Sequence, residues 1–302
     1  MLSIKTPLTE SLPLGQSNNA RVWLKMEALQ PCGSFKLRGV GHACEIYYSR
    51  GAQRFISSSG GNAGLAVAYA GRRLGVPVVV FVPETTSQRA RDLLALEGAD
   101  VRVSGSSWAE ANQAALALKG LNDAFIHPFD DPLLWEGHAT MIDEVVADGV
   151  IPDAVVLSVG GGGLLSGVDA GLTRNGLAEV PIYAAETAGM ASYQAALQAG
   201  KPVRLPVLSG VATSLGARQV CDHAWQISRQ RPVLPCIVSD RQAVDACLTF
   251  ADDHRVVTEP ACGAALAVLY SQQLRSAGLN NILLVVCGGA TATLSSLQEF
   301  RE

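Results

Sequence analysis

A lysine and three glycine-rich turns are the parts of this sequence whose residue types and spacing could support chemistry. Lys36 lies in the turn 31–39, beside Phe35 and at the start of an expected helix. An amine near a helix N-terminus and out of water shifts toward its neutral, nucleophilic form, so Lys36 could attack a carbonyl or accept a proton. Phe35 could cover a flat ring. The ordinary alternative is a surface lysine with a solvated head.

Four consecutive glycines, Gly160 to Gly163, stand between an expected strand and an expected helix in the turn 159–167. Because they lack Cβ atoms, their backbone N–H groups can converge at the helix N-terminus and bind a phosphate without a cationic side chain. The pattern is neither G-x-G-x-x-G nor a Walker loop, since Leu164 and Leu165 follow it. A single small phosphate is therefore favoured over a nucleoside triphosphate. A flexible or closely packed turn is the alternative.

The turn 57–64 is rich in small residues and contains Asn62. The amide of Asn62 can donate a hydrogen bond to a phenolate-like oxygen, and its small neighbours would let a ligand approach closely. A helix N-cap is the alternative, since Ser59 or Asn62 could satisfy the first turn of a helix expected over 63–74. Both roles can coexist.

The elements that must position these turns alternate between short β-branched runs and helical stretches. Strands are predicted over 76–82, 100–103, 153–159, 181–185 and 281–286. A helix is predicted over 87–96, with Ser87 as its N-cap and Gly98 as its stop. Nearly continuous apolar strands alternating with helices indicate an α/β fold with parallel sheets covered on both faces. Ligands of such sheets bind beyond the carboxyl ends of the strands.

Composition excludes several classes of protein. A chain of 302 residues corresponds to roughly two domains, and a hydrophobic content of 48% with 17% charged residues allows a sizeable core. The formal charge is −4, and the absence of a long basic run argues against nucleic-acid binding. No apolar stretch approaches the ~20 residues that span a bilayer, and the start lacks the apolar run of a signal peptide. We therefore expect a cytoplasmic protein without membrane or nucleic-acid partners.

The cysteines argue against a disulfide framework or a zinc site, because their number is odd, no C-x-x-C pair occurs and the five histidines do not cluster with them. They are Cys32, Cys44, Cys221, Cys236, Cys247, Cys262 and Cys287. Small buried thiols in a reducing compartment are expected for all of them except Cys287, whose position suggests a function.

Six motifs together resemble the fold type II pyridoxal-phosphate (PLP) enzymes, the tryptophan synthase β-like group. Within it they look most like the serine/threonine dehydratases, closest to the serine dehydratase-like branch. The motifs occur in the family's order over nearly the whole chain: 34–39 (SFKLRG), 58–64 (SSGGNAG), 160–163 (GGGG), 186–189 (ETAG), 259–263 (EPACG) and 286–289 (VCGG). The resemblance implies two three-layer α/β domains with parallel sheets, a large one from 1–38 and 139–302 and a small one from 39–138. The cofactor would lie in a cleft between them that closes on substrate.

The resemblance also implies a role for each matching residue. Lys36 would hold the PLP aldehyde as an imine, Phe35 would stack on the pyridine ring, and Asn62 would hydrogen-bond the 3′ oxygen of that ring. The residues expected to hold the cofactor phosphate are Gly160, Gly161, Gly162, Gly163 and Leu164. Those expected to contact the substrate carboxylate are Ser59, Gly60 and Gly61.

Cys287 would face the pyridine nitrogen. An acidic partner at that position would protonate the nitrogen and make the ring a strong electron sink, whereas a thiol is a weak donor that leaves it unprotonated. The substrate carbanion is then less delocalised, which favours prompt β-elimination over transamination or racemisation. A buried thiol at the end of a strand is the alternative.

The implied reaction is β-elimination of water. The substrate amine would displace Lys36, which would then remove the α proton while the β-hydroxyl leaves, protonated by the cofactor phosphate. Hydrolysis of the released aminoacrylate would give pyruvate and ammonia from L-serine, or 2-oxobutanoate and ammonia from L-threonine.

The family further implies a homodimer and a monovalent cation such as K⁺. Its expected ligands are Glu186, the hydroxyl of Ser192 and backbone carbonyls near Met190 and Val211.

Several alternatives stay open. Serine racemase is similar but keeps a serine at the position of Gly60, so we expect racemisation to be slow or absent. Cysteine synthase and threonine synthase types share the fold, but the segment 259–263 and Cys287 favour the dehydratase. Lys36 counts against a silent PLP-binding regulatory protein, and the missing Rossmann fingerprint counts against a nicotinamide dehydrogenase. The chain ends shortly after its last expected strand, so we expect no regulatory domain and no response to isoleucine.

Overall fold

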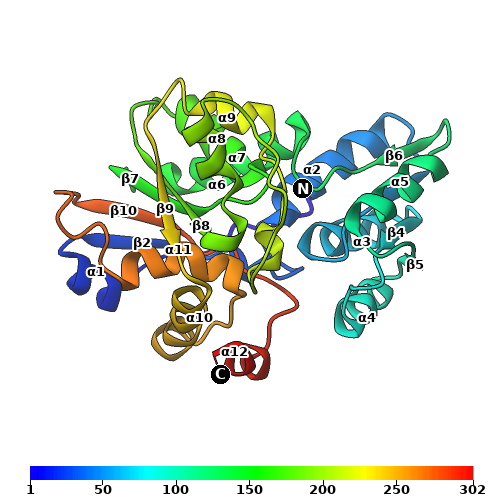
Figure 1. Cartoon of the computed structure of the whole chain (residues 1–302). Coiled ribbons are helices and arrows are strands. Elements are labelled where there is room, and N and C mark those ends of the chain that lie inside the picture. The colour runs from blue at the N-terminus through cyan, green and yellow to red at the C-terminus, as the bar shows by residue number, and fades with distance from the viewer. Residues whose placement is uncertain (302) are drawn as a thin grey trace.

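The computed structural model describes residues 1–301, which form two sheets of unequal size with helices packed on them (Figure 1). The larger sheet consists of β1 (Leu8–Glu10), β2 (Arg21–Lys25), β7 (Ala154–Ser158), β8 (Ile182–Thr187), β9 (Val233–Val238) and β10 (Asn281–Val285), in the order β1-β2-β10-β7-β8-β9. The smaller sheet consists of β3 (Arg54–Ser57), β4 (Val78–Val82), β5 (Asp100–Val103) and β6 (Asp123–Phe125), in the order β5-β4-β3-β6. The predicted α/β class is confirmed.

The helices connect and cover these strands. They are α1 (Leu12–Asn18), α2 (Lys36–Ser49), α3 (Asn62–Leu74), α4 (Gln88–Leu96), α5 (Trp108–Leu118), α6 (Pro132–Ala147), α7 (Gly163–Arg174), α8 (Ser192–Ala199), α9 (Asp222–Ile227), α10 (Asp240–His254), α11 (Pro260–Tyr270) and α12 (Leu294–Arg301). Three 3-10 turns are η1 (Glu27–Leu29), η2 (Ala188–Met190) and η3 (Thr213–Leu215). Within residues 1–301, no helix is long and apolar enough to cross a membrane.

The five predicted strands all form, with ends shifted by no more than two residues. In β4 and β7 every residue is buried, because helices cover both sides of these parallel strands, whereas β5 lies at a sheet edge and leaves Val103 exposed. The expectation of parallel sheets is wrong for one edge strand. β1 runs antiparallel to β2, with Leu8 opposite Lys25 and Glu10 opposite Trp23. Neighbouring antiparallel strands need only a short connection, and here the chain turns back through the single short helix α1.

Two helix starts test the predicted caps. Ser87 caps α4 as predicted, since its hydroxyl accepts from the amide of Ala90 at 3.3 Å. The alternative that Ser59 or Asn62 caps α3 is wrong. Gly61 is the N-cap, no side chain caps this end, and Asn62 is the first helical residue. Its side chain is therefore available for contacts outside the helix.

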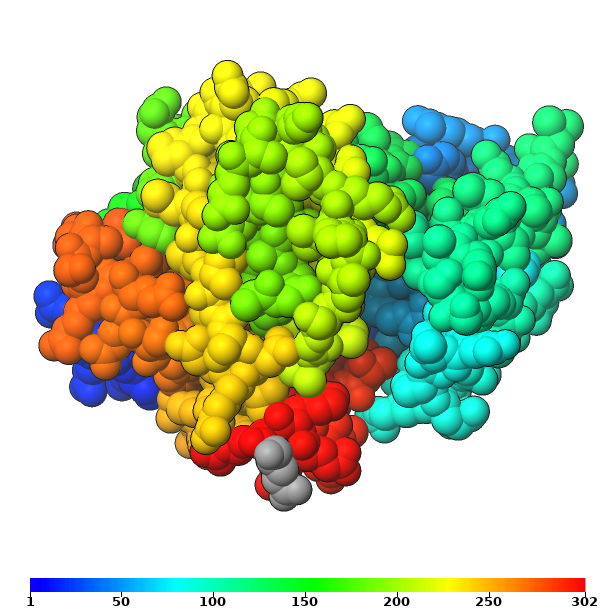
Figure 2. Space-filling view, in the orientation of Figure 1, coloured from blue at the N-terminus to red at the C-terminus, as the bar shows by residue number. Residues whose placement is uncertain are grey.

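The chain leaves the larger sheet after β2, builds the whole smaller sheet and returns at β7. The helices α2 and α6 lie at the two crossings and pack against each other, and α2 also packs against α3. In Figure 2 the surface is hollowed between the cyan and teal elements of the smaller sheet and the yellow-green segment near residue 210. Red atoms of the C-terminal part of the chain lie at the base of this recess.

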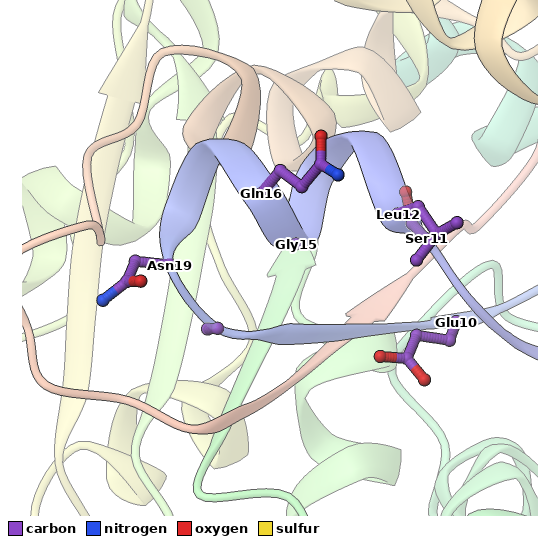
Figure 3. Close-up of a pocket in the computed structure, with 7 residues that line it drawn as sticks. Glu10, Ser11, Leu12, Gly15, Gln16 and Asn19 are labelled. Atoms are coloured by element: carbon purple, nitrogen blue, oxygen red, sulfur yellow. The ribbon is translucent and has the colours of Figure 1, made fainter.

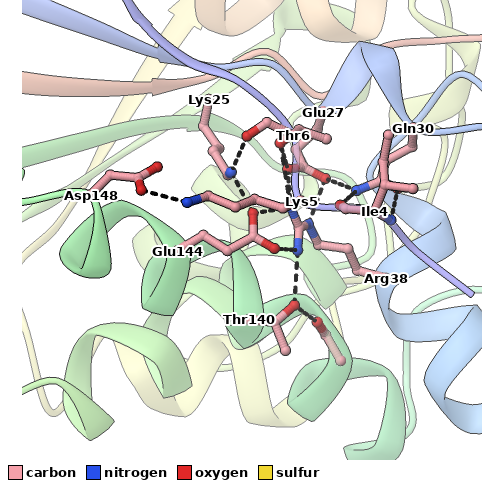
Figure 4. Close-up of polar contacts among 11 residues, drawn as sticks. Ile4, Lys5, Thr6, Lys25, Glu27, Gln30, Arg38, Thr140, Glu144 and Asp148 are labelled. Atoms are coloured by element: carbon pink, nitrogen blue, oxygen red, sulfur yellow. Dashed lines mark hydrogen bonds and ion pairs between the residues drawn. The ribbon is translucent and has the colours of Figure 1, made fainter. Parts of the chain in front are cut away.

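A buried ion cluster ties α2 to the larger sheet (Figure 4). Arg38 donates to Glu27 at 2.7 and 2.8 Å, and to both oxygens of Glu144 at 2.7 Å. Lys25 donates to the carbonyl of Thr6 at 2.8 Å and to Glu144 at 2.5 Å. The side chains of Arg38, Glu27 and Lys25 are fully buried. Two positive and two negative side chains therefore neutralise each other inside the protein. Each stays charged because its oppositely charged partners offset the cost of burying it.

Replacing Arg38 with methionine should lower the free energy of unfolding by about 3–5 kcal/mol, because Glu27 would remain buried without its cation. Denaturant unfolding of the Arg38→Met variant measures this loss. Arg174→Met is the matched control, since the ion pair of Arg174 with Asp143 is largely exposed and should contribute under about 1 kcal/mol. A loss at Arg38 no larger than that at Arg174 would contradict the prediction.

Candidate active site

Lys36 is the first residue of α2, and its ammonium lies among residues of several distant segments. Its Nζ donates to the carbonyl of Pro128 at 2.6 Å and lies 5.1 Å from the ring centre of Phe35. The side chain keeps some accessible surface, yet its dense surroundings desolvate the charge and lower the pKa to about 8, against the opposing effect of the Glu259 carboxylate. A substantial share of this amine is therefore neutral just above neutral pH.

The turn that leads into α2 is pinned to the turn that follows β10. Ser34 forms a β-bridge with Gly288, and the amide of Phe35 donates to the carbonyl of Cys287 at 3.1 Å. Gly33 has φ +76°, and a Cβ there would lie 3.2 Å from the Cβ of Ala290. The close approach of these two turns brings Lys36 next to the C-terminal segment.

The four-glycine turn follows β7 and enters α7, as predicted. Gly162 is the N-cap with φ +99°. A Cβ on Gly161 would lie 2.4 Å from the ring of Phe129, and one on Gly162 would lie 2.4 Å from the Cβ of Ala224. Among residues 1–301, the amides of Gly160, Gly161 and Gly162 have no hydrogen-bond acceptor. Unpaired amides at the start of a helix are suited to bind a phosphate.

Asn62 reaches from α3, beside the smaller sheet, to residues of the larger one. Its Nδ2 donates to Oε1 of Glu259 at 2.8 Å, and its Oδ1 accepts from the amide of Ala290 at 3.1 Å. The hydroxyl of Ser214 lies 3.5 Å from Nδ2. Because Lys36 acts electrostatically on Glu259, Asn62 lies in the same part of the molecule as the lysine.

Cys287 follows β10 and is buried. A hydrogen bond with the thiol of Cys262 in α11, together with burial, raises the pKa of Cys287 well above its ordinary value. The thiol therefore stays neutral and can act only as a weak donor. All seven cysteines are free thiols.

The turn of Ser59, Gly60 and Gly61, which is expected to contact the substrate carboxylate, is compact. The hydroxyl of Ser59 accepts from the amide of Gly61 at 3.3 Å. A Cβ on Gly60 would lie 2.8 Å from Cγ2 of Thr86 and 3.1 Å from Cγ1 of Val82, so any side chain at this position requires Thr86 to move. Glycine therefore fits the packing at position 60. It also has no side-chain proton that it could donate to a substrate.

Glu186, the expected cation ligand, lies at the end of β8 and is buried. Its two carboxylate oxygens each accept a backbone amide at 2.8 Å, from Tyr193 and Gln194 in the first turn of α8. Burial raises its pKa to about 7, against these hydrogen bonds. Within residues 1–301, the buried hydroxyls of Thr187 and Ser192 have no hydrogen-bond partner. Ser192 begins the helix whose first-turn amides bind the carboxylate, so its hydroxyl is an unpaired neutral oxygen in the same part of the chain.

The two other expected cation ligands lie on adjoining segments. Met190 is buried in η2, next to Gly189. The carbonyl of Gly189 accepts from the amide of Ser209 at 3.1 Å, which holds the loop carrying Val211 alongside η2. The amide of Val211 donates to Asp240 at 3.3 Å.

Three residues that the sequence analysis did not single out complete the site. They are Pro128, whose carbonyl binds Lys36, Phe129, whose ring covers the glycine turn, and Glu259, which binds Asn62. Pro128 and Phe129 follow β6. Their position after a parallel strand could have identified them, because ligands of such sheets bind beyond the carboxyl ends of the strands. Glu259 was visible only as the acid of a matched motif.

A separate surface pocket of about 260 Å³ lies against α1 (Figure 3). Its lining residues are Glu10, Ser11, Leu12, Gly15, Gln16, Asn19 and Ala20. It includes none of the residues predicted for the site and offers a single acid without a base. The pocket therefore holds no acid–base pair of its own.

Known proteins resemble this chain over its whole length. A sequence model of the pyridoxal-phosphate dependent enzymes matches residues 2–288. L-serine dehydratase of Dictyostelium discoideum is 45% identical over 100% of this chain and 92% of its own. Human L-serine dehydratase/L-threonine deaminase is 43% identical over 100% of this chain and 95% of its own. The crystal structure of a fungal L-serine ammonia-lyase from Rhizomucor miehei is 35% identical and superposes with a TM-score of 0.94, covering 99% of this chain and 98% of that one.

Proposed function

Because this chain belongs to the family of pyridoxal-phosphate dependent enzymes, we propose that it dehydrates L-serine, L-threonine or both, releasing ammonia with pyruvate or 2-oxobutanoate. It is a PLP-dependent lyase of the serine/threonine dehydratase type. The observation that carries the assignment is Lys36, an amine of lowered pKa that binds the carbonyl of Pro128, in a chain that aligns end to end with L-serine dehydratases.

The residues of the site fit the cofactor. The free amides of Gly160 to Gly162 at the start of α7 would hold its phosphate, and the partly neutral amine of Lys36 would bind its aldehyde. Phe35 would cover the ring, Asn62 would hydrogen-bond its oxygen, and Cys287 would face its nitrogen. When bound, PLP supplies an electron sink for the pair left at the substrate Cα.

The chain's own residues handle the substrate and its proton. Lys36 accepts the α proton at Nζ, since a pKa near 8 leaves much of the amine unprotonated at mildly alkaline pH. The turn of Ser59, Gly60 and Gly61 binds the substrate carboxylate at the start of α3, where the helix dipole favours an anion. Cys287 stays a neutral thiol, so it provides no strong acid that would prolong the life of the carbanion.

We also propose the domain division of 39–138 as a small domain and 1–38 with 139–302 as a large one. Every strand of the smaller sheet falls inside 39–138 and every strand of the larger sheet outside it. Both boundaries fall within helices, α2 and α6, that pack against each other. A change in the angle between the two sheets would therefore pass through this helix pair.

Three finer parts of the proposal concern the surroundings of the enzyme. A monovalent cation such as K⁺ would bind at Glu186, Met190, Ser192 and Val211. One buried carboxylate and the unpaired hydroxyl of Ser192 support this, since a single charge among neutral oxygens suits a monovalent better than a divalent ion. A homodimer is supported by the general frequency of twofold oligomers. A cytoplasmic location is supported by seven free, buried thiols.

A substrate panel tests this function. The protein purified with PLP is assayed for keto acid release from L- and D-serine and from L- and D-threonine, in K⁺ or in tetramethylammonium. We expect release from the L-amino acids and a fall in rate in tetramethylammonium. We also expect L-serine to be racemised about 100-fold more slowly than it is eliminated, because Gly60 offers no second proton donor.

Other outcomes would redirect the proposal. Interconversion of L- and D-serine at a rate comparable with elimination would favour the racemase alternative. Replacement of the β-hydroxyl by an added thiol, without keto acid, would favour a cysteine synthase type. An unchanged rate in tetramethylammonium would remove the cation site.

A further inference from the structure

Glu259 occupies the N-cap position of α11, but its side chain makes no capping hydrogen bond to that helix. An N-cap side chain ordinarily accepts a hydrogen bond from the first helical turn, and Ser, Thr, Asp and Asn are the favoured residues. Glu259 precedes α11 without any such bond, and its Oε1 accepts instead from Nδ2 of Asn62 at 2.8 Å. Its side chain is buried, where an unpaired carboxylate would be costly. The position of this acid is therefore explained by its partner rather than by the helix.

The two partners of Asn62 determine which way its amide faces. The backbone amide of Ala290 can only donate, so the atom 3.1 Å from it is the side-chain oxygen of Asn62. An ionised Glu259 can only accept, so the atom 2.8 Å from it is the nitrogen. The two contacts come from separate segments and agree, and a flipped amide would lose both. One N–H of Nδ2 remains, and within residues 1–301 its one acceptor is the hydroxyl of Ser214, at a long 3.5 Å.

The backbone around Glu259 is shaped to admit its side chain. Gly289 has φ +140°, and a Cβ there would lie 2.3 Å from Cγ of Glu259. The main-chain carbonyl of Glu259 accepts from the thiol of Cys247 at 3.2 Å, which fixes the residue from the other side. The positive charge of Lys36 acts on the carboxylate, so the acid lies close to the amine.

We propose that Glu259 is a positioning residue, which holds the Asn62 amide so that its remaining N–H points at the ring oxygen of the cofactor. This inference rests on the proposed function. Glu259 acts through Asn62 and has no role of its own in proton transfer. Without it, the amide could rotate and present its oxygen, an acceptor, to the oxygen of the ring.

The surroundings of Glu259 also predict how the site responds to pH. Burial raises its pKa to about 7, while hydrogen bonds from Ser214 and Asn62 and the charge of Lys36 oppose that rise. The other titratable groups that face it are the thiols of Cys247, Cys262 and Cys287. The carboxylate that accepts from Asn62 is therefore present above about pH 7 and lost below it, so the spectrum of the bound cofactor should change across this range.

A double-mutant cycle on PLP affinity tests the proposal. The dissociation constant of PLP is measured by stepwise dilution of the holoenzyme, for the wild type, Asn62→Ala, Glu259→Ala and the double variant. We expect each single variant to bind PLP about 10- to 100-fold more weakly, the loss of a hydrogen bond involving a charged group. We expect the double variant to be no weaker than Asn62→Ala alone, because Glu259 acts only through Asn62.

Two further variants separate positioning from packing. Glu259→Gln keeps the volume and an acceptor oxygen, so it should restore most of the PLP affinity while its spectrum no longer changes near pH 7. Thr258→Val is the matched control, since Thr258 is buried next to Glu259 and, among the residues that the structure describes, its hydroxyl hydrogen-bonds the thiol of Cys247 alone. This control should leave the PLP affinity within about twofold of wild type.

The proposal is overturned if the losses of Asn62→Ala and Glu259→Ala multiply in the double variant, or if Glu259→Ala binds PLP as the wild type does. It is also overturned if the Glu259→Gln spectrum still changes near pH 7 as the wild-type spectrum does, a test that remains if the alanine variant fails to fold. A wild-type protein that binds no PLP would instead overturn the proposed function.

Discussion

Replacing Lys36 with alanine should reduce keto acid release by about 1,000-fold or more and remove the visible absorbance band of the bound cofactor. One amine is expected to hold the cofactor and to accept the α proton, so its loss removes both functions at once. A base alone contributes about 100- to 10,000-fold. Steady-state assays with L-serine and L-threonine, and an absorbance spectrum of each purified variant, measure the two effects.

The control for this variant is Lys201→Ala, because Lys201 is exposed and belongs to no part of the site. Its activity and spectrum should match those of the wild type. Borohydride reduction of the wild-type holoenzyme followed by peptide mapping should place the cofactor on Lys36. Labelling of a different lysine, or an Lys36→Ala variant with an unaltered spectrum, would refute the assignment.

The predicted parts of the site are those that local sequence controls. A lysine at the start of a helix, a run of glycines between a strand and a helix, and an asparagine among small residues can each be identified from neighbouring residues. The structure places Lys36 first in α2 and Gly162 at the cap of α7 accordingly. Five strands of the sheets were predicted for the same reason, from their apolar runs, whereas β2, β3, β6 and β9 were not predicted.

The parts that escaped prediction depend on contacts between distant segments. Asn62 and Glu259 meet because the start of α3, a helix that packs on the smaller sheet, lies against the start of α11, a helix that packs on the larger sheet. No pattern near either residue encodes that meeting, and a helix cap was the natural local interpretation of Asn62. The strand β1 escaped for another reason. With three residues, it is too short to carry a periodic signal.

Charge also links the parts of the site. Lys36 lies in surroundings that disfavour its charge, and Glu259 in surroundings that disfavour its own, yet each lowers the cost of the other. A proton lost from the lysine therefore makes the carboxylate easier to protonate. The pair provides a physical reason why an amine of lowered pKa and an acid of raised pKa occur together around Asn62.

Replacing Gly162 with alanine should weaken PLP binding by about 100-fold. Alanine at φ +99° costs about 1–3 kcal/mol of backbone strain, and its Cβ would lie 2.4 Å from the Cβ of Ala224. Both effects are relieved only if the turn moves, which would separate the converging amides of Gly160 and Gly161 from a bound phosphate. A displacement that reduces the free energy of PLP binding by about 3 kcal/mol corresponds to the expected 100-fold rise in the dissociation constant. The dissociation constant of PLP measures it.

Gly176→Ala separates the loss of the phosphate site from the general cost of alanine at positive φ. Gly176 follows the other end of α7 with φ +74°, and a Cβ there would meet nothing within 4 Å. This variant should lose stability to backbone strain but bind PLP with wild-type affinity. Equal affinities in Gly162→Ala and Gly176→Ala would show that the amides at the start of α7 do not hold the phosphate. A loss confined to Gly162→Ala would place the phosphate at that helix end, because the two variants carry the same kind of strain at opposite ends of one helix.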